Sequence, residues 1–223
     1  MAQSIQSLIA ATVNGVIRRL FPDDYSSLCH VHAIVGANLI SIVLNRVYRP
    51  VAGLAVIDCG KGNFIRLLDN AAFANPAGGA FHCWIESAEV VIREKEVVDL
   101  TFRHNKDYAA KNGFAWRRPD PPEFLWGPWS RVVIRADLAR LPPSFAEGKV
   151  WLHETDEGWD WMTHHLAENM NAYVTLTAEA LKELQAALPP GSSLLAPLLP
   201  PKPAGDSAAV RTGSAPASVP SPA

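Results

Sequence analysis

The segment from about residue 28 to residue 44 or 47 constrains the fold most, because its composition is helical yet it is apolar on nearly every side. Its aliphatic positions fall all around a helix: Val31, Ile34, Val35, Leu39, Ile40, Ile42, Val43 and Leu44. Such a helix is stable only when protein surrounds it. Ser26 or Ser27 is expected to cap it, and the small Gly36 and Ala37 should let another element approach closely. The sequence therefore predicts a buried central helix.

The segments on either side of this helix are typical of one amphipathic helix and several short strands. Apolar residues recur at helical spacing over residues 3–20. After Pro50 the sequence favours strands, with a turn at residues 61–63. The expected strands are 51–58, 64–68, 80–86, 90–93 and 97–101, the last three as an antiparallel meander.

The second half of the chain is less regular. Residues 114–129 are proline- and tryptophan-rich and are expected to form a loop. The other expected elements are a short helix over 104–111, strands at 131–134 and 149–154, and helices over 159–170 and 177–188, the last capped by Thr177. Together these predictions describe an α+β domain over residues 1–188. Residues 189–223 hold 9 of the 18 prolines and are expected to be a disordered tail.

Composition excludes several classes of function. The net charge of −2 and the pI of about 6.4 do not favour nucleic acid or an anionic membrane as a partner. The apolar stretch at residues 2–17 has no preceding basic residue and is interrupted by polar ones, so it resembles neither a signal peptide nor a spanning helix. Three cysteines favour free thiols over a disulfide framework, and we expect a cytoplasmic protein with no cofactor.

Three residues together indicate thiol chemistry. Cys29 falls at the start of the buried helix, His82 in one expected strand and Asp99 in another. A helix N-terminus and a neighbouring imidazole both lower the pKa of a thiol, which makes it a nucleophile. A carboxylate that fixes the imidazole completes a Cys-His-Asp triad, with the logic of the serine triad. We expect Asp99 to meet His82 on the sheet face that receives the helix.

The strand periodicity adds candidates around this triad. Trp84 and Glu86 share a strand face with His82, and Thr101 shares one with Asp99. His32 lies one turn after Cys29 and is either near the thiol or a buried, hydrogen-bonded histidine. Cys59 and Cys83 are interpreted as packing residues.

The motifs His82-Cys83-Trp84-Ile85-Glu86 and Asp99-Leu100-Thr101, with Cys29 opening a buried helix, resemble the transglutaminase-like branch of the papain-like cysteine enzymes. That branch includes transglutaminases, arylamine N-acetyltransferases and bacterial peptidases. The resemblance covers residues 20–105 and departs from the usual pattern at Cys83, where a small residue is common. It implies a helix packed on an antiparallel sheet, with Cys29 as nucleophile, His82 as base and Asp99 as orienting group.

By this resemblance the substrate is an amide or a thioester, and hydrolysis is favoured over transfer to an amine. The backbone N–H of Cys29 or the Tyr25 hydroxyl is the expected oxyanion donor. Aromatic residues of the 114–129 loop, Trp116 and Trp126 together with Trp129, are expected either to wall the substrate site or to cover a sheet edge.

Two alternatives stay open. One is a catalytically inactive binding or regulatory domain on the same fold. The other is a zinc-stabilised interaction module that uses Cys29 and His32 with Cys59 or Cys83, although the spacing lacks the paired ligands typical of zinc.

Overall fold

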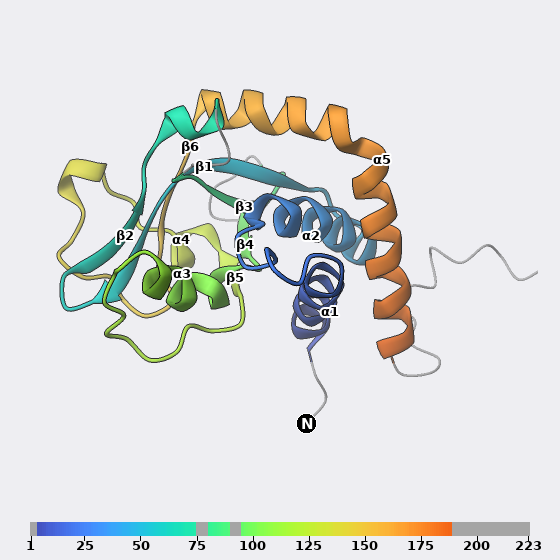
Figure 1. Cartoon of the computed structure of the whole chain (residues 1–223), viewed down its shortest axis with the longest axis horizontal. Coiled ribbons are helices and arrows are strands. Elements are labelled where there is room, and N and C mark those ends of the chain that lie inside the picture. Colours follow the sequence, from blue (N-terminus) through green and yellow to red (C-terminus); the bar gives the residue numbers. More distant parts are fainter. Residues whose placement is uncertain (1–3, 75–79, 90–94, 189–223) are drawn as a thin grey trace, which may run out of the picture.

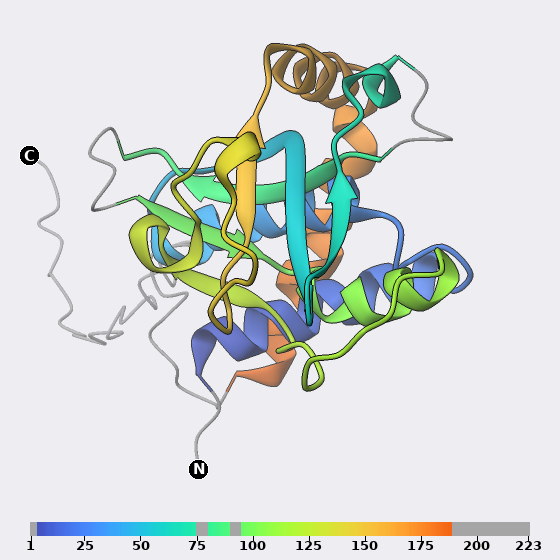
Figure 2. The ribbon, with the colours of Figure 1, turned by 90° about the vertical axis from the view of Figure 1, so that its left-hand side faces the viewer.

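The computed structural model describes residues 4–74, 80–89 and 95–188. The fold is α+β: the long helices α1 (Ile5–Leu20), α2 (Cys29–Leu44) and α5 (Asp156–Ala187) lie on one side of an antiparallel sheet (Figure 1). Figure 2 looks toward the sheet, with α2 and the second half of α5 behind it and the first half of α5 along its top. Helix α1 begins at Ser4, whose side chain accepts a hydrogen bond from the Ser7 N–H at 3.1 Å.

Six strands form the sheet, and they are β1 (Tyr48–Gly60), β2 (Asn63–Leu67), β3 (His82–Ser87), β4 (Glu96–Asp99), β5 (Leu125–Pro128) and β6 (Trp151–Glu154). The order is β2-β1-β3-β4-β5, and β6 also pairs with β1. All these pairs are antiparallel. The shorter elements are η1 (Asn70–Phe73), η3 (Phe102–His104), α3 (Asn105–Lys111), α4 (Trp129–Val132) and η4 (Leu138–Arg140).

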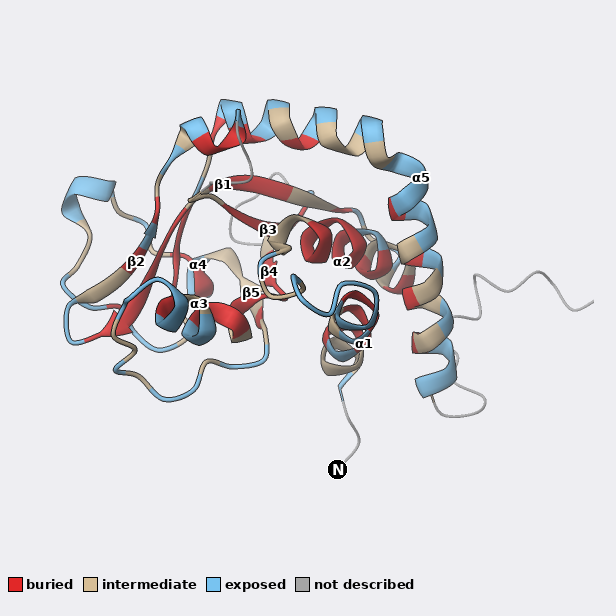
Figure 3. Cartoon of the chain, viewed as in Figure 1, coloured by how far each residue is buried: buried red, intermediate tan, exposed pale blue. Residues whose placement is uncertain are grey.

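Apolar side chains fill both faces of the sheet. The alternation along β3 places Cys83 and Ile85 in the cluster that contains the cores of α1, α2 and α5, whereas Trp84 belongs to a second cluster on the opposite face. Figure 3 shows the result: α2 and the sheet interior are buried, and the outward side of α5 is exposed.

Helix α2 is buried, as predicted from the apolar residues on nearly every side of it. A methyl group added to Gly36 would lie 2.7 Å from Ile85 Cδ1 and 2.6 Å from Leu100 Cδ1, so α2 does approach the sheet closely at this glycine. The predicted serine cap is wrong. Leu28 is the N-cap residue without a side-chain hydrogen bond, and the Ser27 hydroxyl instead donates to the carbonyl of Asp24.

The second half of the chain differs from the sequence prediction in several elements. The expected loop 114–129 ends in β5, because Leu125–Pro128 pairs with β4, and the expected strand 131–134 begins inside α4. Helix α5 is kinked at Asn169, which confirms the expected end of a helix near residue 170, but the next helical segment follows directly instead of beginning at Thr177. Thr155 caps that helix, while Thr177 lies inside it and accepts a hydrogen bond from Asn38.

The remaining strand expectations are confirmed at β1, β2, β3, β4 and β6, and the short helix at α3. The expected strand over 90–93 and the tail 189–223 lie outside the described residues. Within the part of the chain that the structure describes, no helix is both long and apolar enough to cross a membrane.

Candidate active site

Cys29 is the first residue of α2, and its side chain is partly exposed. The first N–H groups of a helix have no partner within it, and the helix dipole places about half a positive charge at this end. Helix α2 packs against β3, and the Cys29 thiol lies close enough to His82, the first residue of β3, for the two groups to shift each other's pKa. The fold thus brings the thiol to the imidazole that the sequence assigned to it.

His82 and Asp99 form a buried hydrogen-bonded pair. His82 Nε2 lies 2.9 Å from Asp99 Oδ2. The other carboxylate oxygen of Asp99 accepts two hydrogen bonds from Thr101, from its N–H at 2.9 Å and from its hydroxyl at 2.7 Å. The register that pairs Ile85 with Val98, continued by one residue, makes Asp99 a diagonal neighbour of His82. Adjacent strands therefore hold the imidazole, and Thr101 fixes the carboxylate.

The electrostatic interactions among Cys29, His82 and Asp99 favour a Cys29 thiolate beside a His82 imidazolium. The interaction with Cys83 contributes most to holding the pKa of the Cys29 thiol well below its ordinary value; burial opposes it, and His30 and His82 add to it. Burial acts to lower the pKa of His82, but the charge and hydrogen bond of Asp99, together with Cys29, raise it to about 10. Burial acts to raise the pKa of Asp99, and His82 and Thr101 hold it below its ordinary value.

Cys83 is a part of this group that the sequence interpretation missed. We expected the helix on the His82 face of β3, but the body of α2 packs on the opposite face, where Cys83 points. The Cys29 thiol therefore meets both side chains at the beginning of the strand. Burial, with the neighbouring Cys29, raises the pKa of Cys83 well above its ordinary value, so Cys83 stays a thiol that donates to Cys29. The unusual cysteine between His82 and Trp84 was the available signal.

Trp84 and Glu86 support the site from the other face. The Trp84 ring stacks beside the His82 ring, with centroids 6.3 Å apart. Its indole N–H donates to Glu86 at 2.9 Å, and Glu86 is itself buried and pairs with Arg49 at 3.1 Å and with Lys95. Glu86 thus accepts these hydrogen bonds behind the site, on the strand face that the sequence predicted for it.

Tyr25 and His32 lie in a second polar region, around His104. His32 Nδ1 is 3.0 Å from the Leu28 carbonyl, its Nε2 is buried without a partner, and burial lowers its pKa. The Tyr25 ring packs edge-on against His104, with centroids 5.3 Å apart, and Arg18 lies over it. These contacts show His32 as a buried histidine and give Tyr25 no partner among the triad residues.

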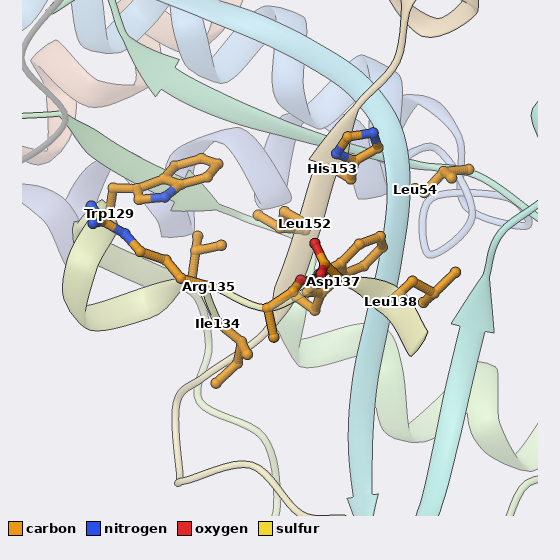
Figure 4. A pocket seen from close by; sticks show the side chains of 11 residues that line it. Leu54, Trp129, Ile134, Arg135, Asp137, Leu138, Leu152 and His153 are labelled. Atoms are coloured by element: carbon orange, nitrogen blue, oxygen red, sulfur yellow. Dashed lines mark hydrogen bonds between the residues drawn. The ribbon is translucent and has the colours of Figure 1, made fainter. Parts of the chain in front are cut away.

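The three tryptophans expected to share one wall are separated. Trp116 and Trp129 pack on the cluster of the far sheet face, and Trp126 packs on the helix-side cluster. The Trp116 indole donates to the Pro119 carbonyl at 3.0 Å. Trp129 lines a separate cavity of about 490 Å³ beside β6, shown in Figure 4, and it is alone among the predicted site residues in doing so. The tryptophans thus cover both faces of the sheet.

The first half of α5 brings further aromatic residues to the triad. The His30 ring contacts the rings of Trp161 and His165, with centroids 5.8 and 5.1 Å apart. Phe81, the neighbour of His82, contacts Trp161 at 5.2 Å. Neither Trp161 nor His165 was assigned a site role from the sequence, because periodicity within a helix over 159–170 does not show that this helix packs near Cys29. On the α3 side, burial and the nearby Cys29 raise the pKa of Tyr108.

No group of three or more histidine, cysteine, aspartate or glutamate side chains suited to a metal ion occurs among residues 4–74, 80–89 and 95–188. The donors named for the zinc alternative are accounted for otherwise: Cys59 is buried in the far cluster, and Cys29 and Cys83 face each other.

Comparison with known proteins adds evidence on the fold alone. No family model and no curated protein matches the chain. A solved crystal structure described only as genomics APC5867 is similar, with a TM-score of 0.54 and 15% sequence identity over 82% of this chain and 79% of that one. At this identity the likeness establishes a shared overall fold.

Proposed function

We propose that the protein is a cysteine-dependent acyl-transfer enzyme, most simply a thiol hydrolase acting on an amide or a thioester. The observation that carries the proposal is the buried pair of His82 and Asp99 at 2.9 Å, next to a thiol at a helix N-terminus. The α+β arrangement of a buried helix on an antiparallel sheet supports a papain-like or transglutaminase-like core.

The His82 tautomer follows from its hydrogen bond. Because Nε2 is held by Asp99, Nδ1 is the ring nitrogen left for the Cys29 thiol. The thiolate attacks the carbonyl carbon of the substrate, and the imidazolium gives its proton to the departing amine or thiol. Water, deprotonated by His82, then resolves the acyl-thioenzyme and returns the thiolate.

The backbone N–H of Cys29 is the proposed oxyanion donor. Cys29 is the first residue of α2, so its N–H has no carbonyl within the helix to which it can donate a hydrogen bond. The oxyanion would form close to this N–H, at the positive end of the helix dipole. The contacts of Tyr25 with His104 and Arg18 do not support the alternative donor.

Alkylation by iodoacetamide, followed by peptide mass spectrometry, tests the proposal without knowledge of the substrate. We expect Cys29 to react at pH 6–7, where an ordinary thiol with a pKa of about 8.5 is largely protonated. The buried Cys59 and Cys83 are internal controls in the same protein. A Cys29 that reacts no faster than Cys59, with an ordinary thiol pKa, would contradict the proposal.

A separate experiment distinguishes an enzyme from an inactive binding domain on the same fold. Simple thioesters should acylate Cys29 and raise the intact mass by one acyl group, and turnover should regenerate the free enzyme. Cys29→Ser and Cys29→Ala should give no such adduct. Ligand binding by wild type without an acyl adduct would favour the inactive domain.

A further inference from the structure

A cavity lies against the first half of α5, on the side of the triad where His30 and Phe81 meet Trp161. It has a volume of about 380 Å³ and is lined by Asn70, Phe73, Ala74, Glu157, Trp161, His164, His165 and Glu168. This volume falls within the range of roughly 300–1,000 Å³ that small-ligand sites occupy.

Flat rings make up one wall of this cavity. The rings of Trp161 and His165 are stacked within 13° of parallel, with centroids 4.9 Å apart, and Phe73 lies 5.9 Å from Trp161. His165 is fixed by Tyr173, whose hydroxyl is 2.7 Å from its Nε2. A planar group that entered the cavity would extend this stack of rings.

The same rings connect the cavity to the triad. His30 follows Cys29 in the chain and contacts both Trp161 and His165. Phe81 precedes His82 and contacts Phe73 and Trp161, with centroids 4.9 and 5.2 Å apart. The rings that line the cavity therefore pack directly against the chain neighbours of two triad residues.

The polar atoms of the cavity are mainly acceptors. Glu157 and Glu168 contribute exposed carboxylates, and Glu168 also pairs with His164 at 3.1 Å. The Asn70 amide donates to Glu157 at 3.2 Å, which leaves its carbonyl oxygen, Oδ1, buried without a partner. Lysine and arginine do not line this cavity. The cavity thus calls for a ligand that is planar, cationic and rich in N–H donors.

We infer that this cavity is the specificity pocket of the cysteine site and that it takes a guanidinium group, such as the arginine side chain of a peptide substrate. The inference rests on the proposed function, because it makes the cavity a part of the substrate site. A guanidinium stacks on aromatic faces, carries five N–H donors in a plane and pairs with carboxylates through two of them. An ammonium group matches the charge but not the planar wall.

Binding of small probes to the Cys29→Ala variant of the full chain tests this inference, with affinities measured by NMR titration. The probes are N-acetyl-arginine amide, its citrulline analogue, which keeps the planar shape without the charge, and N-acetyl-lysine amide. We expect the arginine probe to bind about tenfold more tightly than the other two. Equal affinity for arginine and citrulline, or for arginine and lysine, would overturn the inference.

Two variants and a control locate the binding. Glu157→Gln with Glu168→Gln should weaken the arginine probe about tenfold and leave citrulline unchanged, and Trp161→Leu should weaken both. Because Trp161 is partly buried, the exposed double variant remains informative if Trp161→Leu does not fold. Asp160→Asn removes an exposed charge from the same helix outside the cavity and should change nothing. An arginine preference that survives the double variant would place the binding elsewhere.

These measurements separate the two proposals. Probe binding in a variant without the thiol does not depend on turnover, so arginine-selective binding together with an unreactive Cys29 in wild type would end the proposed function alone. Acylation of Cys29 by thioesters without arginine selectivity would end the pocket inference alone.

Discussion

The exchange Asp99→Asn keeps the shape of a buried side chain and removes its negative charge. The asparagine carbonyl can still accept the hydrogen bonds from Thr101, which leaves the amide NH₂ facing His82 Nε2. An NH₂ group can only donate there, so the imidazole must present an acceptor at Nε2 and carry its proton at Nδ1. The neutral ring then has no acceptor for the proton of the Cys29 thiol.

The size of the effect follows from the pKa of His82. Its value of about 10, against an ordinary histidine value of 6.5, corresponds to about 5 kcal/mol in favour of the imidazolium. Asp99 is the principal cause, and Cys29 contributes the rest. Because Cys83 also holds the Cys29 thiolate, part of this free energy passes to the thiol, and thiolate chemistry at neutral pH should slow by on the order of 10–10²-fold.

The assay is the rate of Cys29 alkylation by iodoacetamide between pH 5 and pH 10, with thermal unfolding as a check on folding. Asp99→Asn should move the midpoint of the rate toward that of an ordinary thiol. Asp58→Asn is the matched control, since Asp58 is also buried and accepts backbone hydrogen bonds, from Gly60 at 2.6 Å and Phe145 at 2.5 Å. An unchanged midpoint in Asp99→Asn, or an equal shift in Asp58→Asn, would refute the reasoning.

Further predictions concern pH and packing. With increasing pH, kcat/KM for a thioester should rise as Cys29 ionises, below the ordinary thiol pKa, and should fall as His82 loses its proton near pH 10. A pH–rate profile measures both changes. Gly36→Ala should lower the free energy of unfolding in urea by about 1–3 kcal/mol, because its methyl group would clash with α2's neighbours. Gly15→Ala, in α1 with open space around it, should raise that free energy by up to about 1 kcal/mol. Glu86→Ala should lower the free energy of unfolding in urea by about 3 kcal/mol, since it removes a buried partner of Arg49, Lys95 and the Trp84 indole. For Gly36→Ala or Glu86→Ala, a change of less than about 0.5 kcal/mol would contradict the reasoning.

Local pattern predicted the parts of the site that neighbouring strands bring together. The 17 positions between His82 and Asp99 suit a return to an adjacent antiparallel strand, and the structure pairs them. Pattern could not show which sheet face receives α2, since β3 is buried on both sides and neither face is marked as solvent-facing. Cys83 was therefore interpreted as packing only.

The aromatic wall was missed for a different reason. Its members come from η1, the start of β3 and α5, which are distant in the chain, and the bend of α5 at Asn169 has no proline or glycine to signal it. Sequence periodicity describes the inward side of each half helix but not the direction in which the second half continues. Only the three-dimensional course of α5 places Trp161 against His30.

The bent helix α5 joins two parts of the molecule that are usually built from separate elements. Before Asn169 it carries Trp161 and His165; after Asn169 it supplies Tyr173, Ala180 and Leu184 to the core shared with α1 and α2 (Figure 1). The start of α5 also packs closely against β1, because a methyl group on Gly158 would lie 2.3 Å from the Ala52 carbonyl oxygen. Repacking the interior beneath the C-terminal half would thus reach the groups near the thiol through the kink at Asn169.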